Sequence, residues 1–175
     1  MTTWKIDPAH SEIGFKVKHL VISTVKGTFG NFDAEIHSES EEFETSKISF
    51  TAHADSITTN NSMRDDHLKN ADFFNVAEFP TVTFVSTGIT KNTDGTYAVN
   101  GDFTMHGVTK PLTLATTYNG SIVDAYGNMV KSFDIHGALH RSEFGLVWNA
   151  PLESGGVAVS DEVKLEIVAE FKEVK

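Results

Sequence analysis

Residues 163–172 read Val-Lys-Leu-Glu-Ile-Val-Ala-Glu-Phe-Lys, and this stretch decides the fold class. Its odd-numbered residues are all apolar, whereas Lys164, Glu166 and Glu170 stand between them. Successive side chains on a β-strand point to opposite faces, so this segment has one apolar face and one polar face. The pattern predicts an antiparallel strand with one face in the core and the other in water.

The same alternation recurs along the rest of the chain. It predicts eight strands, at residues 11–21, 24–37, 45–57, 79–87, 95–105, 109–119, 130–142 and 160–172. Residues 61–70 (Asn-Ser-Met-Arg-Asp-Asp-His-Leu-Lys-Asn) break the pattern and predict a short surface helix. Asp94-Gly95 and Asn119-Gly120 are typical hairpin-turn dipeptides. Lys26-Gly27 and Gly30-Asn31 predict bends or bulges within the second strand.

Eight strands with one apolar face each must bury those faces together. A single open sheet would leave the apolar side in water, so a barrel or a two-sheet sandwich is expected. The length of several strands favours an all-β, eight-stranded antiparallel barrel, made of residues 1–175 as one domain. A barrel of this size can hold one small ligand in its interior.

Composition excludes several classes of function. The formal net charge is −10, which disfavours binding to nucleic acid or to an anionic membrane surface. There is no Cys, so disulfides and sulfur-based metal sites are excluded. No apolar run is long enough to span a membrane, and the first residues do not resemble a leader peptide. We therefore expect no stable membrane insertion and a cytoplasmic location, or a periplasmic one if a leader has been removed.

Several motifs resemble one known family. They are Trp4-x-Ile6-Asp7-x-x-His10-Ser11 with Ile13-x-Phe15-x-Val17-x-His19-Leu20, Gly27-x-Phe29-x-x-Phe32, His67-Leu68 with Asp72-Phe73-Phe74, Pro80-Thr81-Val82-Thr83-Phe84, residues 101–110 (Gly-Asp-Phe-Thr-Met-His-Gly-Val-Thr-Lys), and Arg141-x-x-Phe144-Gly145. In this order they resemble the YceI-like family. The resemblance implies a lipocalin-like barrel with a helix and an internal tunnel for a polyisoprenoid or similar long-chain lipid. It also implies a homodimer, and no catalytic motif.

The apolar faces of the strands are the candidate tunnel lining. They comprise Phe15, Val17, Ile48, Phe50, Phe84, Val99, Phe103, Leu114, Phe133, Ile135, Leu165 and Ile167. The alternation alone does not separate a hollow barrel from one that these side chains fill as an ordinary core. The resemblance favours the hollow barrel, in which burial of methylene groups alone could drive tight binding.

Three polar residues continue the apolar faces at one end of the barrel. His19 follows the face of the first strand, and Arg141 follows that of the seventh. In an up-and-down barrel these ends share a rim with His106 at the end of the fifth strand and with the segment that carries Arg64. The arrangement predicts a positive cluster that meets a lipid head group. The alternative is that water or backbone satisfies each of these side chains.

Catalytic and metal-dependent functions have weak support. His136 and His140 are four residues apart on one strand, about 13 Å, which is too far to share a zinc ion. His10 and Ser11 are neighbours that would point to opposite faces of a strand, and no nucleophile-elbow motif is present. We therefore expect a non-enzymatic carrier, storage or sequestering protein with no metal and no cofactor. The alternatives are a barrel enzyme that uses a cavity His as an acid or base, and a filled structural barrel.

Overall fold

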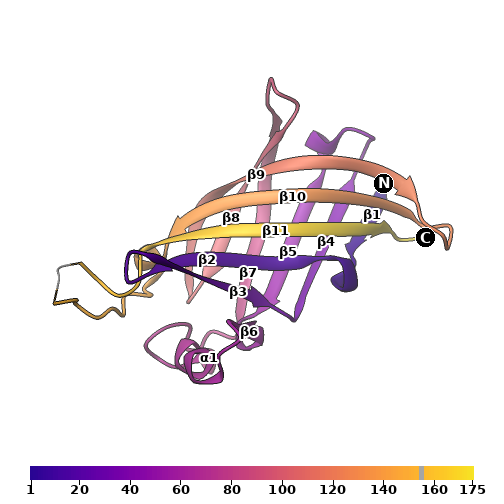
Figure 1. Cartoon of the computed structure of the whole chain (residues 1–175). Coiled ribbons are helices and arrows are strands. Elements are labelled where there is room, and N and C mark those ends of the chain that lie inside the picture. Colours follow the sequence, from indigo (N-terminus) through magenta and orange to yellow (C-terminus); the bar gives the residue numbers. More distant parts are fainter. Residues whose placement is uncertain (154–155) are drawn as a thin grey trace.

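The strands pair antiparallel with one another into a closed barrel (Figure 1). The computed structural model describes residues 1–153 and 156–175. Its elements are β1 (Thr2–Ile6), η1 (Pro8–His10), β2 (Glu12–His19), β3 (Ser23–Phe29), β4 (Phe32–Ser38), η2 (Phe43–Thr45), β5 (Lys47–His53), η3 (Ala54–Ser56), β6 (Ile57–Thr58), α1 (Ser62–Lys69), β7 (Thr81–Lys91), β8 (Tyr97–Met105), β9 (Val108–Val123), β10 (Met129–His140), η4 (Arg141–Phe144) and β11 (Glu162–Glu173), where η denotes a 3-10 helix. Within the described residues, no helix has the length and apolar character that crossing a bilayer requires.

The barrel closes between the first and last strands of the chain. β1 pairs with β11 through Ile6 and Phe171, while β2 pairs with the other half of β11 through Ile13 and Ile167. β1 and β2 are thus two halves of one barrel strand that η1 interrupts. In the same sense, Gly30-Asn31 divides one barrel strand into β3 and β4, and η3 divides another into β5 and β6. Counted so, the fold is the predicted closed barrel of eight antiparallel strands, with α1 as its short helix.

The boundaries of the first strand differ from the prediction. Residues 2–6 form β1, although the sequence pattern placed the first strand at 11–21. Trp4 and Ile6 are buried, and the strand pairs on both sides, with β4 and with β11. A strand this short shows too few alternations to stand out from a loop, so its partners rather than its own pattern define it.

Two glycine-based predictions also need correction. Asn119-Gly120 is not a hairpin turn, because β9 continues to Val123 and the turn follows at Asp124. Gly120 has a φ of +123°, and the pairing with β10 shifts there, so the dipeptide forms a bulge inside the strand. Gly27 lies within β3 rather than at a bend. By contrast, Gly30 and Asn31 do separate β3 from β4, and Asp94-Gly95 forms the β7–β8 turn.

The two ends of the barrel are built differently. In Figure 1 both chain termini lie at one end, and the β2–β3 hairpin and the segment before β11 lie at the other. We call the second end, with α1 beside it, the mouth. The opposite end, covered by η2, is called the inner end. Two clusters of buried apolar residues hold the wall together, one around Phe84 and Phe103 and one around Trp4 and Phe133.

Candidate functional site

The barrel encloses an apolar cavity of about 610 Å³. Every predicted tunnel residue lies in its wall: Phe15, Val17, Ile48, Phe50, Phe84, Val99, Phe103, Leu114, Phe133, Ile135, Leu165 and Ile167. His19 and Met63, at the mouth, are both exposed and both belong to the lining, so the cavity reaches the surface there. The role of these residues in ligand binding stays a prediction.

The exposure of inward-facing side chains shows that the interior is not filled. Phe50, Ile135 and Leu165 point into the barrel, yet each is only partly buried. In the described part of the chain, no large side chain is less than 2% exposed. A close-packed core would bury its central residues fully. The space inside the barrel is therefore a cavity rather than a packed core.

An aromatic plug closes the inner end. Phe43 of η2 lies against Tyr97 and Phe133, with ring centroids 4.9 and 5.1 Å apart. Phe133 also contacts Tyr118 and Phe171 at 5.3 and 5.9 Å. Such tilted and edge-on contacts are the preferred arrangements of aromatic pairs. The plug therefore sets how far a bound molecule can extend into the barrel.

α1 covers one side of the mouth, and a buried carboxylate fixes its position. Asn61 caps the helix by accepting a hydrogen bond from the N–H of Arg64. Asp65 accepts hydrogen bonds from both the backbone N–H and the hydroxyl of Thr59. Burial acts to raise the pKa of Asp65, but the hydrogen bonds from Thr59, together with Thr58 and the charge of Arg64, outweigh burial and keep this pKa below its ordinary value. Arg64 donates to the hydroxyl and the carbonyl of the same Thr59, at 2.7 and 2.8 Å.

Aromatic contacts join α1 to the segment after η4. The His67 ring meets Trp148 edge-on at 4.9 Å and Phe73 at 5.0 Å, and its Nε2 lies 2.9 Å from the carboxylate of Asp72. His67, Phe73 and Trp148 all line the cavity. The mouth is thus framed by α1 on one side and by the segment around Trp148 on the other.

Arg141 is buried in the wall of the mouth. Its guanidinium donates to the carbonyls of Ser160, Leu146, Trp148 and Val159, at 2.9, 2.8, 2.9 and 3.3 Å. These bonds occupy four of its five N–H groups. Burial lowers the pKa of Arg141, although an arginine retains its proton. Within the described residues no carboxylate lies within ion-pair distance of Arg141, although the nearby carboxylate of Asp161 acts to raise its pKa. A positive charge therefore lies beside the cavity, with Asp161 as its nearest acidic neighbour.

The structure separates the three predicted rim residues. His19 lines the cavity and forms an isolated bridge with Val159, whose carbonyl Arg141 also contacts. His106 is close in space but lies outside the lining. Its Nδ1 is 3.0 Å from the carbonyl of Phe144, and its ring packs on Phe79 with centroids 4.7 Å apart. The up-and-down order of the strands predicted that His106 lies at this rim, but it follows β8 in the tight β8–β9 turn and its ring packs on Phe79 instead of lining the cavity.

Sequence reasoning missed Phe43 and Trp148, which close the inner end and frame the mouth. Neither lies on a strand, so the alternation of apolar residues carried no signal for them. Residues 67–74 did carry a signal, since their motif contributed to the family resemblance and now proves to include the lining residues His67, Leu68, Phe73 and Phe74.

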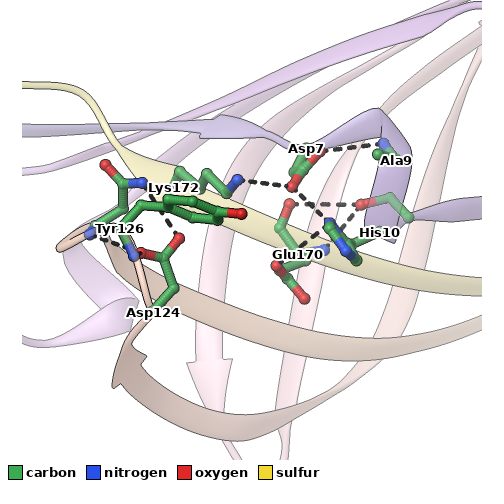
Figure 2. A network of polar contacts seen from close by, with 9 residues as sticks. Asp7, Ala9, His10, Asp124, Tyr126, Glu170 and Lys172 are labelled. Carbon is green, nitrogen blue, oxygen red and sulfur yellow. Dashed lines mark hydrogen bonds and ion pairs between the residues drawn. The ribbon is translucent and has the colours of Figure 1, made fainter.

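A polar network on the outside of the barrel joins η1 to β11 (Figure 2). The carboxylate of Asp7 lies 2.8 Å from Nδ1 of His10 and 3.1 Å from Nζ of Lys172. The hydrogen bond with His10 lowers the pKa of Asp7 and raises that of His10. Asp7, His10 and Glu170 have the spacing of a metal-ligand group. The ammonium of Lys172 already lies against this group and fits it better as an ion-pair network.

Fold and cavity together define an antiparallel barrel with an apolar internal chamber that opens at the mouth. A family model described as the YceI-like domain matches residues 4–171. A UPF0312 protein from Staphylococcus aureus (strain bovine RF122 / ET3-1) is 38% identical over 172 residues, which cover 98% of each chain. The chain belongs to the YceI-like family, as the sequence motifs predicted.

Solved structures agree with this assignment. A Campylobacter jejuni YceI protein superposes with a TM-score of 0.78 at 31% identity and covers 97% of this chain and 96% of its own. Burkholderia cenocepacia BcnA gives a TM-score of 0.80 at 22% identity, with 94% and 98% coverage. A polyisoprenoid binding domain from Saccharophagus degradans gives 0.67 at 12% identity and 98% coverage of both chains. The last two likenesses establish the fold alone.

Proposed function

We propose that this protein binds one long apolar chain, a polyisoprenoid or similar lipid, inside its barrel and carries, stores or sequesters it without chemical change. The observation that carries the proposal is the cavity of about 610 Å³, whose wall is made almost entirely of hydrocarbon and aromatic side chains. Burial of an apolar ligand in such a cavity contributes a large favourable binding free energy, whereas burial of a polar ligand contributes little.

The energetics of burial favour a long chain over a small molecule. Each methylene group that leaves water contributes about 0.8 kcal/mol, so ten contribute roughly 8 kcal/mol. This equals the free energy of micromolar binding before the cost of ordering the chain is subtracted. Chain length therefore decides affinity, and no hydrogen bond inside the cavity is required.

The mouth supports a preference for a negatively charged head group. Arg141 and His19 both belong to the lining, and no carboxylate in the described part of the chain lies within ion-pair distance of Arg141, although Asp161 is close enough to interact with its charge. A chain bound with its apolar end against Phe43 would place its head group near these residues. The domain from Saccharophagus degradans, described as polyisoprenoid binding, supports the choice of ligand class through its shared fold.

The test is native mass spectrometry of the delipidated protein with farnesol and with hexadecanoic acid. Val17→Trp places an indole in the cavity near the mouth, whereas Lys18→Trp places the same side chain on the outer face of β2. We expect a one-to-one complex for the wild type and for Lys18→Trp, and weak or no binding for Val17→Trp. Equal binding by both variants, or none by the wild type, would contradict the proposal. Conversion of the bound lipid would favour an enzyme.

A further inference from the structure

Exposed apolar side chains surround the opening of the cavity. Leu20, Val21 and Ile22, at the tip of the β2–β3 hairpin, are 43%, 66% and 87% exposed. Val157, in the segment that pairs with the hairpin, is 46% exposed. Met63 of α1 and Val147 after η4 are 83% and 68% exposed. We call these six residues the apolar rim. Met63 lines the cavity itself, so the apolar surface continues from the outside of the protein into the barrel.

The hairpin tip holds its apolar residues in an unfavourable conformation. Leu20 and Val21 have φ values of 53° and 69°, in the left-handed region. This region disfavours a β-branched side chain such as Val, and hairpin turns of this kind usually carry Gly or Asn. A turn selected only to join two strands would not need Val at this position. The identity of these residues is therefore not explained by the geometry of the turn.

The tip is a fixed part of the mouth. The N–H of Leu20 donates to the carbonyl of Ala158 at 2.8 Å, and the N–H of Ser160 donates to the carbonyl of Lys18 at 3.0 Å. These bonds join the hairpin to the segment whose carbonyls hold Arg141. The hairpin part of the apolar rim is consequently joined to the wall of the opening by backbone hydrogen bonds.

We propose that the apolar rim docks on the surface of a lipid bilayer, peripherally and reversibly, so that the cavity opens directly onto the acyl-chain region. This inference rests on the proposed function, because a long apolar ligand has to pass between a bilayer and the cavity without crossing water. Apolar residues that reach into the headgroup boundary provide a dry path. A second copy of the chain seated on the rim would instead cover the opening.

The charge distribution selects the kind of bilayer. Residues 20–25 (Leu-Val-Ile-Ser-Thr-Val) carry no charge, and the exposed Arg64 and Asp66 beside Met63 are of opposite sign, while the whole chain has a formal net charge of −10. An anionic surface would repel the protein, whereas a zwitterionic surface would accept the uncharged rim. Docking therefore requires apolar insertion and no basic patch.

The test compares two pairs of exposed apolar residues at opposite ends of the barrel. Val21→Asn with Ile22→Ser removes the tip without changing charge, and Asn also suits the left-handed conformation. Ile122→Ser with Val123→Asn is the matched control, because these residues are 71% and 55% exposed at the far end of β9. Three measurements are made: flotation with phosphatidylcholine vesicles, the rate at which a fluorescent fatty acid leaves those vesicles for the protein, and equilibrium binding of that fatty acid added from ethanol.

We expect the tip variant to lose flotation, because two inserted side chains are removed. It should take up the probe from vesicles at about one tenth of the wild-type rate or more slowly. Its equilibrium binding from ethanol should be unchanged, and the control should match the wild type in all three measurements. Wild-type transfer by the tip variant, or equal losses in both variants, would overturn the inference. The inference would also be overturned if gel filtration showed a dimeric wild type and a monomeric tip variant, because a second copy of the chain would then occupy the rim. Failure of the wild type to bind the probe from ethanol would instead reject the proposed function.

Discussion

The ring of Phe43 lies 5.1 Å from the ring of Phe133, and this pair separates two hollows. On one side is the main cavity of about 610 Å³, and on the other is a hollow of about 290 Å³ that opens at the inner end. Both residues line both spaces. Phe133 belongs to the barrel wall, whereas Phe43 sits on η2, a three-residue turn. The inner limit of the cavity thus depends on one side chain carried by a short connection.

Replacing Phe43 by Ala is expected to join the two hollows and to raise the longest chain that the protein binds. Because Phe43 is only partly buried, the loss of stability should be near or below the low end for Phe→Ala, about 3 kcal/mol. Native mass spectrometry with saturated alcohols of increasing length measures the limit. Phe43→Leu, which keeps a bulky plug, is the control. An unchanged length limit in Phe43→Ala would contradict the role of this residue.

Two glycines next to phenylalanine rings should respond differently to replacement by Ala. The three atoms nearest to a Cβ at Gly27 would all belong to the ring of Phe15, with Cζ at 2.3 Å, and that ring borders the cavity. A Cβ at Gly101 would meet the Phe84 ring at 2.4 Å and also the backbone carbonyl of Val85 at 2.5 Å. The Phe15 ring can move into open space, whereas a backbone carbonyl within a sheet cannot.

We therefore expect Gly27→Ala to lower lipid affinity with little change in stability, and Gly101→Ala to lose about 1–3 kcal/mol of unfolding free energy. Urea unfolding and titration with hexadecanoic acid measure the two effects. If Gly27→Ala proves the less stable variant, the space beside Phe15 is not available to the ring.

The network of Asp7 and His10 predicts a pH dependence of stability. The hydrogen bond with Asp7 raises the pKa of His10, so the contribution of His10 is complete below its unfolded value of 6.5 and is lost as pH rises through the raised value. The hydrogen bond with His10 lowers the pKa of Asp7, so the contribution of Asp7 is present above 3.8 and is lost as pH falls through the lowered value. The pair therefore stabilises the fold most between pH 3.8 and 6.5.

His10→Gln should accordingly lower stability most near the middle of that window, and the difference from the wild type should shrink at alkaline and at strongly acidic pH. Urea unfolding across the pH range measures it. His53→Gln, which removes an exposed imidazole on β5 and leaves the contact between Asp7 and His10 in place, is the control. A difference that grows with rising pH would contradict the assigned contact.

Arg141 is predicted to have separable structural and electrostatic effects. Arg141→Lys keeps the charge but leaves most of the four carbonyls without a donor, so we expect a loss of roughly 2–4 kcal/mol in unfolding free energy. The ratio of affinities for hexadecanoate and hexadecanol should be retained. Arg141→Met should lose a similar amount of stability and also bring that ratio close to one. If Arg141→Lys and Arg141→Met gave the same ratio of affinities for hexadecanoate and hexadecanol, the charge at residue 141 would have no role in selecting the head group.

The architecture could be predicted from the local sequence pattern. An antiparallel strand with one solvent-exposed face alternates polar and apolar residues, so each strand can be recognised from its own residues. The segment 163–172 and its counterparts were sufficient to predict a closed barrel of eight strands. β1 was missed because its five residues are defined by two partners rather than by alternation. Asn119-Gly120 was misassigned because the same dipeptide suits a turn and a bulge, and only pairing with β10 distinguishes them.

The amino-acid order alone determined which side chains face inward, since that follows from the two-residue period of a strand. It did not determine whether the inward space is filled, because volume depends on how the whole circumference closes. It also did not separate Arg141, which borders the cavity, from His106, whose ring is turned onto Phe79. Only the tertiary structure determined the volume of the interior and the positions of Arg141 and His106. The two ends of the barrel are formed by loops and turns, whose sequences have no periodic pattern from which a position could be predicted.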